Sequence, residues 1–281
     1  MKIKILIIVF KKISPYNLSK GGLEMFYKIA LLLLSLTLLT ACSSNDPITY
    51  TNLSSTSSQD ELTLTLSDAG LPKKNIEQFL AAVTTYNQNN PNLSDSEQVM
   101  EDYFVSYTPS VTIPNDLDSQ VASFILAKDL ISTNYSGTLA DSYLTSDLAL
   151  LTADEQLKFA TTFNTISVTG IKNNEISHIN QIEKTFNDRN FTVDEDQDVS
   201  LITLWVHISK ENIRYVNHSG VLVDHDKLYF IEKYARDCPY QMTKFNSRKE
   251  LSEYLLNRSD LKGDENDGPP LVFENNKYLK K

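Results

Sequence analysis

Two apolar, β-rich runs separated by a short polar turn dominate the stretch Tyr215–Lys233, which reads YVNHSGVLVDHDKLYFIEK. Branched and aromatic residues on both sides of an Asp-His-Asp-Lys turn are typical of a β-hairpin. If the loop consists of Asp224–Asp226, the register places His218 directly across from Glu232. Directly opposed residues lie roughly 5 Å apart on one face of a sheet, so this hairpin can join an imidazole to a carboxylate by a hydrogen bond.

A histidine held by a carboxylate supplies two of the three groups of many hydrolytic sites. His218 is followed by a glycine two positions later and then by an apolar strand. This arrangement resembles the strand histidine of papain-like peptidases and cell-wall amidases, whose nucleophile lies earlier in the chain at the N-terminus of a buried helix. The simpler interpretation, which the sequence alone favours, is that His218 and Glu232 form a polar pair on a solvated face of the hairpin.

The candidate nucleophiles are weak. The comparable helix is predicted at Leu117–Ile131, and Ser119 lies near its start. A helix N-terminus favours an anion, but a serine hydroxyl is much harder to ionise than a thiol. Ser119 fits better as a residue that binds the free backbone N–H groups of the helix start. Cys238 follows Asp237, whose charge raises the pKa of a neighbouring thiol, so we interpret this cysteine as a spectator.

The remaining histidines and acidic residues do not form a ligand set. His207 alternates in phase with Trp205 on a predicted strand and is expected to be half-buried, whereas His178 and His225 are expected at the surface. The run Asp194–Asp198 resembles the opening of a calcium loop, but it lacks the glycine and the glutamate that such a loop needs further on. Since no zinc spacing, P-loop or dinucleotide motif appears either, we expect no metal and no cofactor.

A secretory signal precedes the predicted domain. The apolar and small residues Ile29–Leu39 follow Lys28 and end in Leu39-Thr40-Ala41-Cys42. A basic segment, a short apolar segment and small residues before the cut define a signal peptide. The run is too short for a membrane span of about 20 residues. Its last four residues resemble a bacterial lipobox, so we expect lipid on Cys42 and a position at the extracytoplasmic face of the bacterial cell membrane.

Residues 1–24 fit this signal poorly, because they add a second apolar patch and the acidic Glu24 before it. Met25-Phe26-Tyr27-Lys28 makes a better beginning, and Lys20-Gly21-Gly22 is what a purine-rich ribosome-binding site encodes when it is read in frame. We therefore predict that translation starts at Met25, that residues 25–41 form the signal peptide, that residues 42–58 form a lipidated tether, and that residues 59–281 form a single domain.

Charge and cysteine content exclude several classes of protein. The whole chain has a net charge of −10; removal of residues 1–42 takes away six lysines and one glutamate and leaves −15. So acidic a chain is unsuited to nucleic acid and has no polybasic second membrane anchor. With lipid on Cys42, Cys238 has no partner for a disulfide. The expected partners are the membrane and a cell-wall peptide or surface protein; the oligomeric state stays open.

Helical periodicity dominates the first part of the chain and strand patterns the last, which predicts an α+β fold with an antiparallel sheet covered by helices. The change from the helical to the strand pattern lies near Asn190. The predicted helices are 59–68, 73–87, 94–103, 117–131, 152–163, 175–189 and 247–256. The predicted strands are 199–208, the two arms of the hairpin, and a terminal strand or hairpin at 271–279.

Short segments that carry a family resemblance are spread over nearly the whole mature chain: TYTNL (49–53), SQDE (58–61), AGLP (69–72), YN (86–87), HSGVL (218–222), LYFIEK (228–233) and PYQMTKF (239–245). They resemble a family of bacterial surface lipoproteins, found largely in Gram-positive organisms and named only as domain of unknown function 4300. Members of that family often carry Asn-Cys-Arg where this chain has Asp118-Ser119-Gln120. The resemblance implies that the chain has lost a thiol and has kept His218 and Glu232.

Three hypotheses follow. The chain is a lipid-anchored surface protein whose papain-like domain binds a ligand or peptide with little hydrolase activity. Alternatively, it is an active cell-wall amidase or peptidase with Ser119 or Cys238 as nucleophile, or a non-catalytic surface interaction module. Active chemistry needs a nucleophile within hydrogen-bonding reach of His218, and the first hypothesis needs His218 and Glu232 in a cleft that faces a helix N-terminus.

Overall fold

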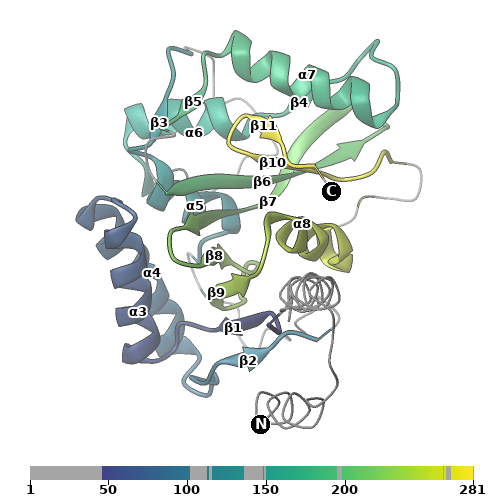
Figure 1. The fold of residues 1–281 in the computed structure, drawn as a ribbon. Coiled ribbons are helices and arrows are strands. Elements are labelled where there is room, and N and C mark those ends of the chain that lie inside the picture. The colour runs from purple at the N-terminus through teal and green to yellow at the C-terminus, as the bar shows by residue number, and fades with distance from the viewer. Residues whose placement is uncertain are drawn as a thin grey trace, which may run out of the picture. The chain divides into compact units, whose positions relative to one another are not determined.

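The predicted hairpin lies at the centre of an antiparallel sheet, which has nine strands within the residues that can be described (Figure 1). A computed structural model describes residues 46–101, 113, 116–135, 148, 150–194, 198–261, 263 and 267–280. Asp46–Lys281 forms one compact unit. The predicted start at Met25, the signal peptide and Cys42 lie outside the described residues.

The strand order is β11-β10-β6-β7-β8-β9-β1-β2, and β4 pairs with β7 beside this path. All pairs described here are antiparallel, and β3 and β5 form a separate two-stranded sheet. The strands are β1 Thr49–Thr51, β2 Gln98–Val99, β3 Ile131–Ser132, β4 Ile166–Ser167, β5 Thr192–Val193, β6 Val199–Ile208, β7 Ile213–Asp224, β8 Leu228–Lys233, β9 Tyr240–Phe245, β10 Leu271–Glu274 and β11 Lys277–Tyr278.

Side-chain caps open most of the helices that the structure describes. An oxygen of each cap accepts a hydrogen bond from a backbone N–H of the first turn, which otherwise lacks a partner. The caps are Ser55, Asp118, Thr152, Asn174 and Ser247. The helices are α3 Thr56–Asp68, α4 Lys73–Asn89, α5 Ser119–Ala127, α6 Ala153–Phe163, α7 Glu175–Asp188 and α8 Arg248–Asn257, with a short 3₁₀ turn at Ser259–Leu261.

The two faces of the sheet are covered by different helices. Successive strand residues point to opposite faces, so the hairpin feeds two cores. Val221 and Val223 pack with α3–α7, whereas Leu222 packs with α8. Figure 1 shows α5 behind β7 and α8 on the side of the viewer. The antiparallel sheet with helical layers confirms the predicted α+β class.

Three predictions about elements are corrected. The Ser94–Glu97 segment does not open a helix, because strand β2 follows it directly and pairs with β1. The tether does not extend to Ser58, because Thr49–Thr51 is a strand of the sheet and α3 begins at Thr56. The helix at Leu117–Ile131 is shorter, with Ile131 in strand β3. None of the helices described is long and apolar enough to cross a membrane.

Candidate functional site

The predicted pair of His218 and Glu232 forms, but in a different register. Glu232 lies opposite Gly220, because Asp224 still pairs with Leu228 and the loop begins one residue later than predicted. This change shifts the register by two residues, so His218 keeps its face and lies diagonally from Glu232. Its Nε2 lies 2.5 Å from Oε2 of the carboxylate.

Gly220 lies beside this diagonal contact. It lies directly opposite Glu232 on the face that both side chains share, and a Cβ atom there would overlap the ring of Phe230. The absence of a side chain leaves the space that the Phe230 ring occupies beside Glu232. The glycine two residues after His218 therefore has a packing role that the sequence motif did not specify.

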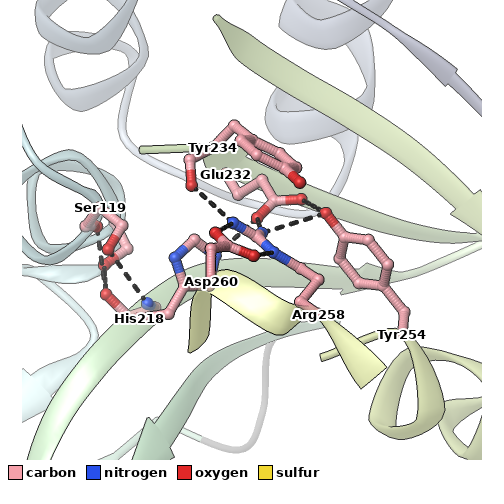
Figure 2. Close-up of polar contacts among 9 residues, drawn as sticks. Ser119, His218, Glu232, Tyr234, Tyr254, Arg258 and Asp260 are labelled. Atoms are coloured by element: carbon pink, nitrogen blue, oxygen red, sulfur yellow. Dashed lines mark hydrogen bonds and ion pairs between the residues drawn. The ribbon is translucent and has the colours of Figure 1, made fainter. Parts of the chain in front are cut away.

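Glu232 is a shared acceptor beneath α8. Its Oε1 accepts a hydrogen bond of 2.6 Å from the hydroxyl of Tyr254, and its Oε2 lies 2.9 Å from Nη1 of Arg258 (Figure 2). The side chains of Glu232 and Arg258 have no exposed surface, and that of His218 is 3% exposed. The predicted solvated pair is therefore wrong: the carboxylate belongs to a buried ionic network.

Arg258 balances this network. Its Nη2 donates to the carbonyl of Tyr234 at 2.9 Å and lies 2.7 Å from Oδ2 of Asp260. The guanidinium also lies over the Tyr234 ring, 3.8 Å from its centroid. A buried arginine is stable when its N–H groups and its charge are both matched. Glu232 and Asp260 supply that charge, and the Tyr234 carbonyl supplies a further acceptor.

The electrostatics hold His218 neutral and Glu232 ionised. Burial lowers the pKa of the imidazole, and the charge of Arg258 adds to this effect against the opposing pull of Glu232. Burial opposes the charge on Glu232, but Arg258 and the hydrogen bond from His218 outweigh it and lower the pKa of the carboxyl. A carboxylate only accepts, so Nε2 carries the imidazole proton and the pair is a neutral donor bound to an anion.

Ser119 lies on the other face of the sheet from the His218 ring. Its Oγ accepts a hydrogen bond from the backbone N–H of Ser219 at 3.3 Å, and its carbonyl accepts one from the Ser219 hydroxyl at 3.1 Å. Ser219 directly follows His218 on β7, so their side chains point to opposite faces. The expected arrangement, in which the imidazole faces the start of the helix, is therefore wrong. In Figure 2 the contacts of Ser119 form a group apart from the Glu232 network.

A second buried ion pair, which the sequence analysis missed, lies next to the start of α5. Lys233 is fully buried, and its Nζ lies 2.7 Å from Oδ2 of Asp116. The ammonium also lies 3.9 Å from the ring centroid of Tyr86 and 4.4 Å from that of Tyr240. Burial lowers the pKa of Lys233 to about 8 despite Asp116. The available signal in the sequence was that Lys233 directly follows Glu232 on a strand. Successive strand side chains point to opposite faces, so when Glu232 is buried in one core, Lys233 points into the other.

Cys238 is buried beside this pair. Its carbonyl accepts from Lys233 Nζ at 2.5 Å. Burial raises the pKa of the thiol, and Asp237 adds to the effect, as predicted from its position next to Cys238. Lys233 and Arg258 lower this pKa, but burial outweighs them, and the thiol lacks the accessible surroundings of a reactive cysteine.

The other histidines divide differently from the prediction. His178 was expected at the surface but is 1% exposed, because α7 packs it against strands β6 and β7. His207 is also fully buried rather than half-buried. His225 is exposed, as predicted, and lies 3.0 Å from Asp198. No group of three or more potential metal ligands occurs in the part of the chain that the structure describes.

A comparison with known protein families gives a match over most of the chain. The model of the family described as "Domain of unknown function (DUF4300)" matches residues 49–279. The chain belongs to the DUF4300 family. No match was found among curated proteins or among solved structures.

The DUF4300 match begins at Thr49, the first residue of β1, and ends after β11. It therefore includes the strand at Thr49–Thr51 that the predicted tether left outside the domain. Within this DUF4300 domain, the partners of His218 and Glu232 that sequence reasoning missed are Tyr254 and Arg258. Both belong to α8 or its C-terminal cap, and only the packing of α8 on the hairpin brings them to Glu232.

Proposed function

We propose that this chain is a lipid-anchored protein of the bacterial cell surface, and that its DUF4300 domain binds a ligand without hydrolysing it. The sequence Leu39-Thr40-Ala41-Cys42 after an apolar run supports the lipid anchor. The proposal against hydrolysis depends on one observation: His218 is buried in a network with Glu232 and Arg258, while Ser119 lies on the opposite face of the sheet.

Hydrolysis requires a nucleophile within hydrogen-bonding reach of its base. Both oxygens of Glu232 are already bound, and the hydroxyl of Ser119 accepts from a backbone N–H. These groups stabilise the junction between the hairpin and two helices. A structural role accounts for every polar contact that they make.

The proposal also includes a papain-like architecture for the domain. It is supported by the packing of the start of α5 against the strand that carries His218, through the contacts of Ser119 with Ser219. The side of the strand occupied by the imidazole differs from what that architecture requires. We therefore propose a distant relationship that retains the helix and the sheet but not the catalytic geometry.

A polar cavity of about 660 Å³ is our candidate for the ligand site. Its volume lies within the range of about 300–1,000 Å³ that is usual for ligand pockets. Charges of both signs suit a zwitterionic ligand such as a cell-wall peptide. Asp46 lies at its edge, only four residues or about 14 Å of extended chain after Cys42, which keeps the cavity close to the membrane surface. Its charged residues include Glu97, Asp224, Asp226, Lys227, Lys244 and Arg248.

A nucleophile replacement tests the proposal against hydrolysis. Ser119→Cys, with and without His218→Ala, is treated with a thiol-reactive probe on the folded protein. Cys238 is present in every variant and sets the background. We expect the added thiol to label at the same rate in both backgrounds. Faster labelling that depends on His218 would mean that the imidazole activates position 119, and would favour the amidase or peptidase alternative.

Ligand binding is tested by charge reversal at the cavity. Calorimetric titration with soluble cell-wall muropeptides is expected to show binding to the wild type and at least a severalfold loss of affinity in Lys227→Glu. Lys210→Glu reverses the charge of an exposed turn residue outside the cavity and is the matched control. Equal affinities in all three proteins would remove this cavity as the ligand site.

Lipid attachment is tested separately in cells. A palmitate analogue is expected to label the wild type, and Cys42→Ala is expected to abolish the label. An unlabelled wild-type protein would refute the anchor and leave the binding proposal to be judged on the titration.

A further inference from the structure

Two histidines and one arginine form a buried cluster on the face of the sheet opposite α8. His178 of α7 and His207 of β6 have ring centroids 4.8 Å apart and meet edge to face. Arg214 of β7 is fully buried, and its Nε and Nη2 lie 3.1 and 2.9 Å from Nδ1 of His178. The cluster therefore joins a helix to the two long central strands.

The geometry requires both imidazoles to be neutral. Nδ1 of His178 faces a guanidinium, which can only donate hydrogen bonds. Nδ1 of His207 accepts a hydrogen bond of 3.0 Å from the backbone N–H of Gly268. A proton added at either Nδ1 would turn an acceptor into a donor that points at another donor. Acid thus removes the contacts that the neutral rings make.

The same cluster fastens the segment that leads into β10. Arg214 Nη1 donates to the carbonyl of Pro269 at 2.8 Å, and Asp267 Oδ1 accepts from the backbone N–H of Ser209 at 2.8 Å. With the bond from Gly268 to His207, three consecutive residues are held just before β10, which pairs with β6. Loss of these contacts frees the N-terminal end of the β10–β11 hairpin.

Two carboxylates near the cluster partly offset the effect of burial on the pKa values of its members. Asp267 favours the charged forms of His207 and Arg214, and Glu175 of α7 favours that of Arg214. Glu175 is also bound by the hydroxyl of Tyr278 on β11 at 2.7 Å. Neither carboxylate forms an ion pair with Arg214 among the described contacts, so the guanidinium is held mainly by imidazole and carbonyl acceptors.

We propose that His178, His207 and Arg214 form an acid-sensitive latch that holds the C-terminal hairpin β10–β11 on the sheet and loosens in mildly acidic surroundings. The latch is independent of the proposed ligand site. A protein displayed outside the cell membrane meets the pH of its surroundings directly, so this property would couple the C-terminal hairpin to external acidity.

The direction of the effect follows from linkage. Burial, Arg214 and His207 lower the pKa of His178 to about 4, while the opened segment would leave the ring near its ordinary value of 6.5. The opened form therefore binds more protons between these values, and the closed form loses stability as pH falls. From about pH 7 to about pH 5, His178 alone raises the opened population roughly 20-fold.

Hydrogen exchange of the mature full-length protein tests the latch. Exchange at the amides of Leu271–Glu274 is measured at pH 7 and pH 5 and corrected for the intrinsic change in rate. We expect a gain of roughly 20-fold in the wild type. In His178→Asn/His207→Asn, the amide oxygens can replace the Nδ1 acceptors but do not titrate, and we expect no gain. His225→Asn, which alters an exposed histidine, is expected to behave like the wild type.

An unchanged corrected rate in the wild type, or an equal gain in the double variant, would overturn the latch. If the double variant does not fold, nitrogen NMR of the wild-type imidazoles decides. Rings of His178 and His207 that remain neutral in the folded protein down to about pH 5 support the proposal, and protonation of either ring near the ordinary value of 6.5 refutes it.

Discussion

Arg258 and Arg214 are both fully buried, yet their surroundings have opposite charge balance. Arg258 is matched by Glu232 and Asp260, and although burial opposes its charge, the neighbouring Tyr254 and Glu232 raise its pKa well above the ordinary value. Burial lowers the pKa of Arg214 to about 10; its direct acceptors are neutral, and Asp267 and Glu175 only partly offset the burial. The first cluster is therefore a closed ionic network, whereas the second depends on which proton states its neighbours adopt.

Because of this difference, the two clusters should respond differently to the loss of a carboxylate and to the addition of a proton. Removing a carboxylate from the first cluster leaves an uncompensated buried charge, which is among the most costly changes in a protein. Adding a proton to the second cluster creates the same problem without any substitution. Both faces hold a neutral, buried imidazole and should lose stability in acid, but Glu232 beside His218 opposes the lowering of that ring's pKa, so the face under α8 should weaken less than the face under α7.

The largest expected effect belongs to Glu232→Gln. This change keeps the size of the side chain but removes the fully buried one of the two charges that neutralise Arg258, so we expect the free energy of unfolding to fall by about 3–5 kcal/mol. Urea unfolding at pH 7 measures it. Glu253→Gln removes the half-exposed partner of the exposed Lys249 on the same helix and should cost less than about 0.5 kcal/mol. Equal losses in the two variants would mean that the buried network contributes no more than a surface pair.

Arg214→Met should cost less, about 2 kcal/mol at pH 7. It leaves the carbonyls of Trp205 and Pro269 without their donor, but it leaves no buried anion behind. It also removes a charge that lowers the pKa of His178. The wild type should lose stability as pH falls from about 6.5 toward about 4, and the variant should lose less, so the gap between them should narrow at pH 5. A gap that widens in acid would contradict the comparison.

Local signals in the sequence were sufficient for most of the elements. Caps such as Thr152 and Ser247 satisfy the first turns of their own helices, and the polar turn at 224–227 closes its own hairpin. These contacts join residues that are close in sequence, so a short segment contains all the information. The Ser94–Glu97 segment shows the limit: Glu97 accepts from Thr49 and Lys244 instead, and strand pairing replaces the helix.

The candidate site depended on contacts between distant segments. The side on which His218 lies follows from alternation along β7, but its partners on α8 depend on the packing of a helix that comes about 30 residues later. His178 looked like a surface residue because a helical pattern does not show which strand the helix will cover. The burial of Arg214 and Arg258 was likewise hidden, since arginine in a sequence normally indicates solvent.

Tyr254→Phe tests a single contact within the closed network. The change removes the hydroxyl that donates to Glu232 at 2.6 Å and accepts from Arg258 at 3.2 Å, so we expect a loss of about 1–2 kcal/mol. Tyr278→Phe is the matched change at the edge of the other cluster, where the hydroxyl donates to the half-buried Glu175. It should cost less than Tyr254→Phe in urea unfolding at pH 7. The reverse order would show that burial of the acceptor does not govern these bonds.

Gly268→Ala is expected to have a smaller effect than Tyr254→Phe. A Cβ atom at this position would lie 3.0 Å from Nη2 of Arg214 and 3.3 Å from Nδ1 of His207, so the guanidinium must shift by a few tenths of an ångström. We expect a loss of about 1 kcal/mol at pH 7, at the low end for overpacking, because the end of a long side chain can move. Urea unfolding at pH 7 and pH 5 measures the effect. The added methyl group also weakens the bond from the Gly268 N–H to His207. A weaker bond penalises protonation of the His207 ring less than the wild-type bond does. The variant should therefore lose less stability in acid than the wild type does, whereas a steeper loss would mean that this bond does not keep His207 neutral.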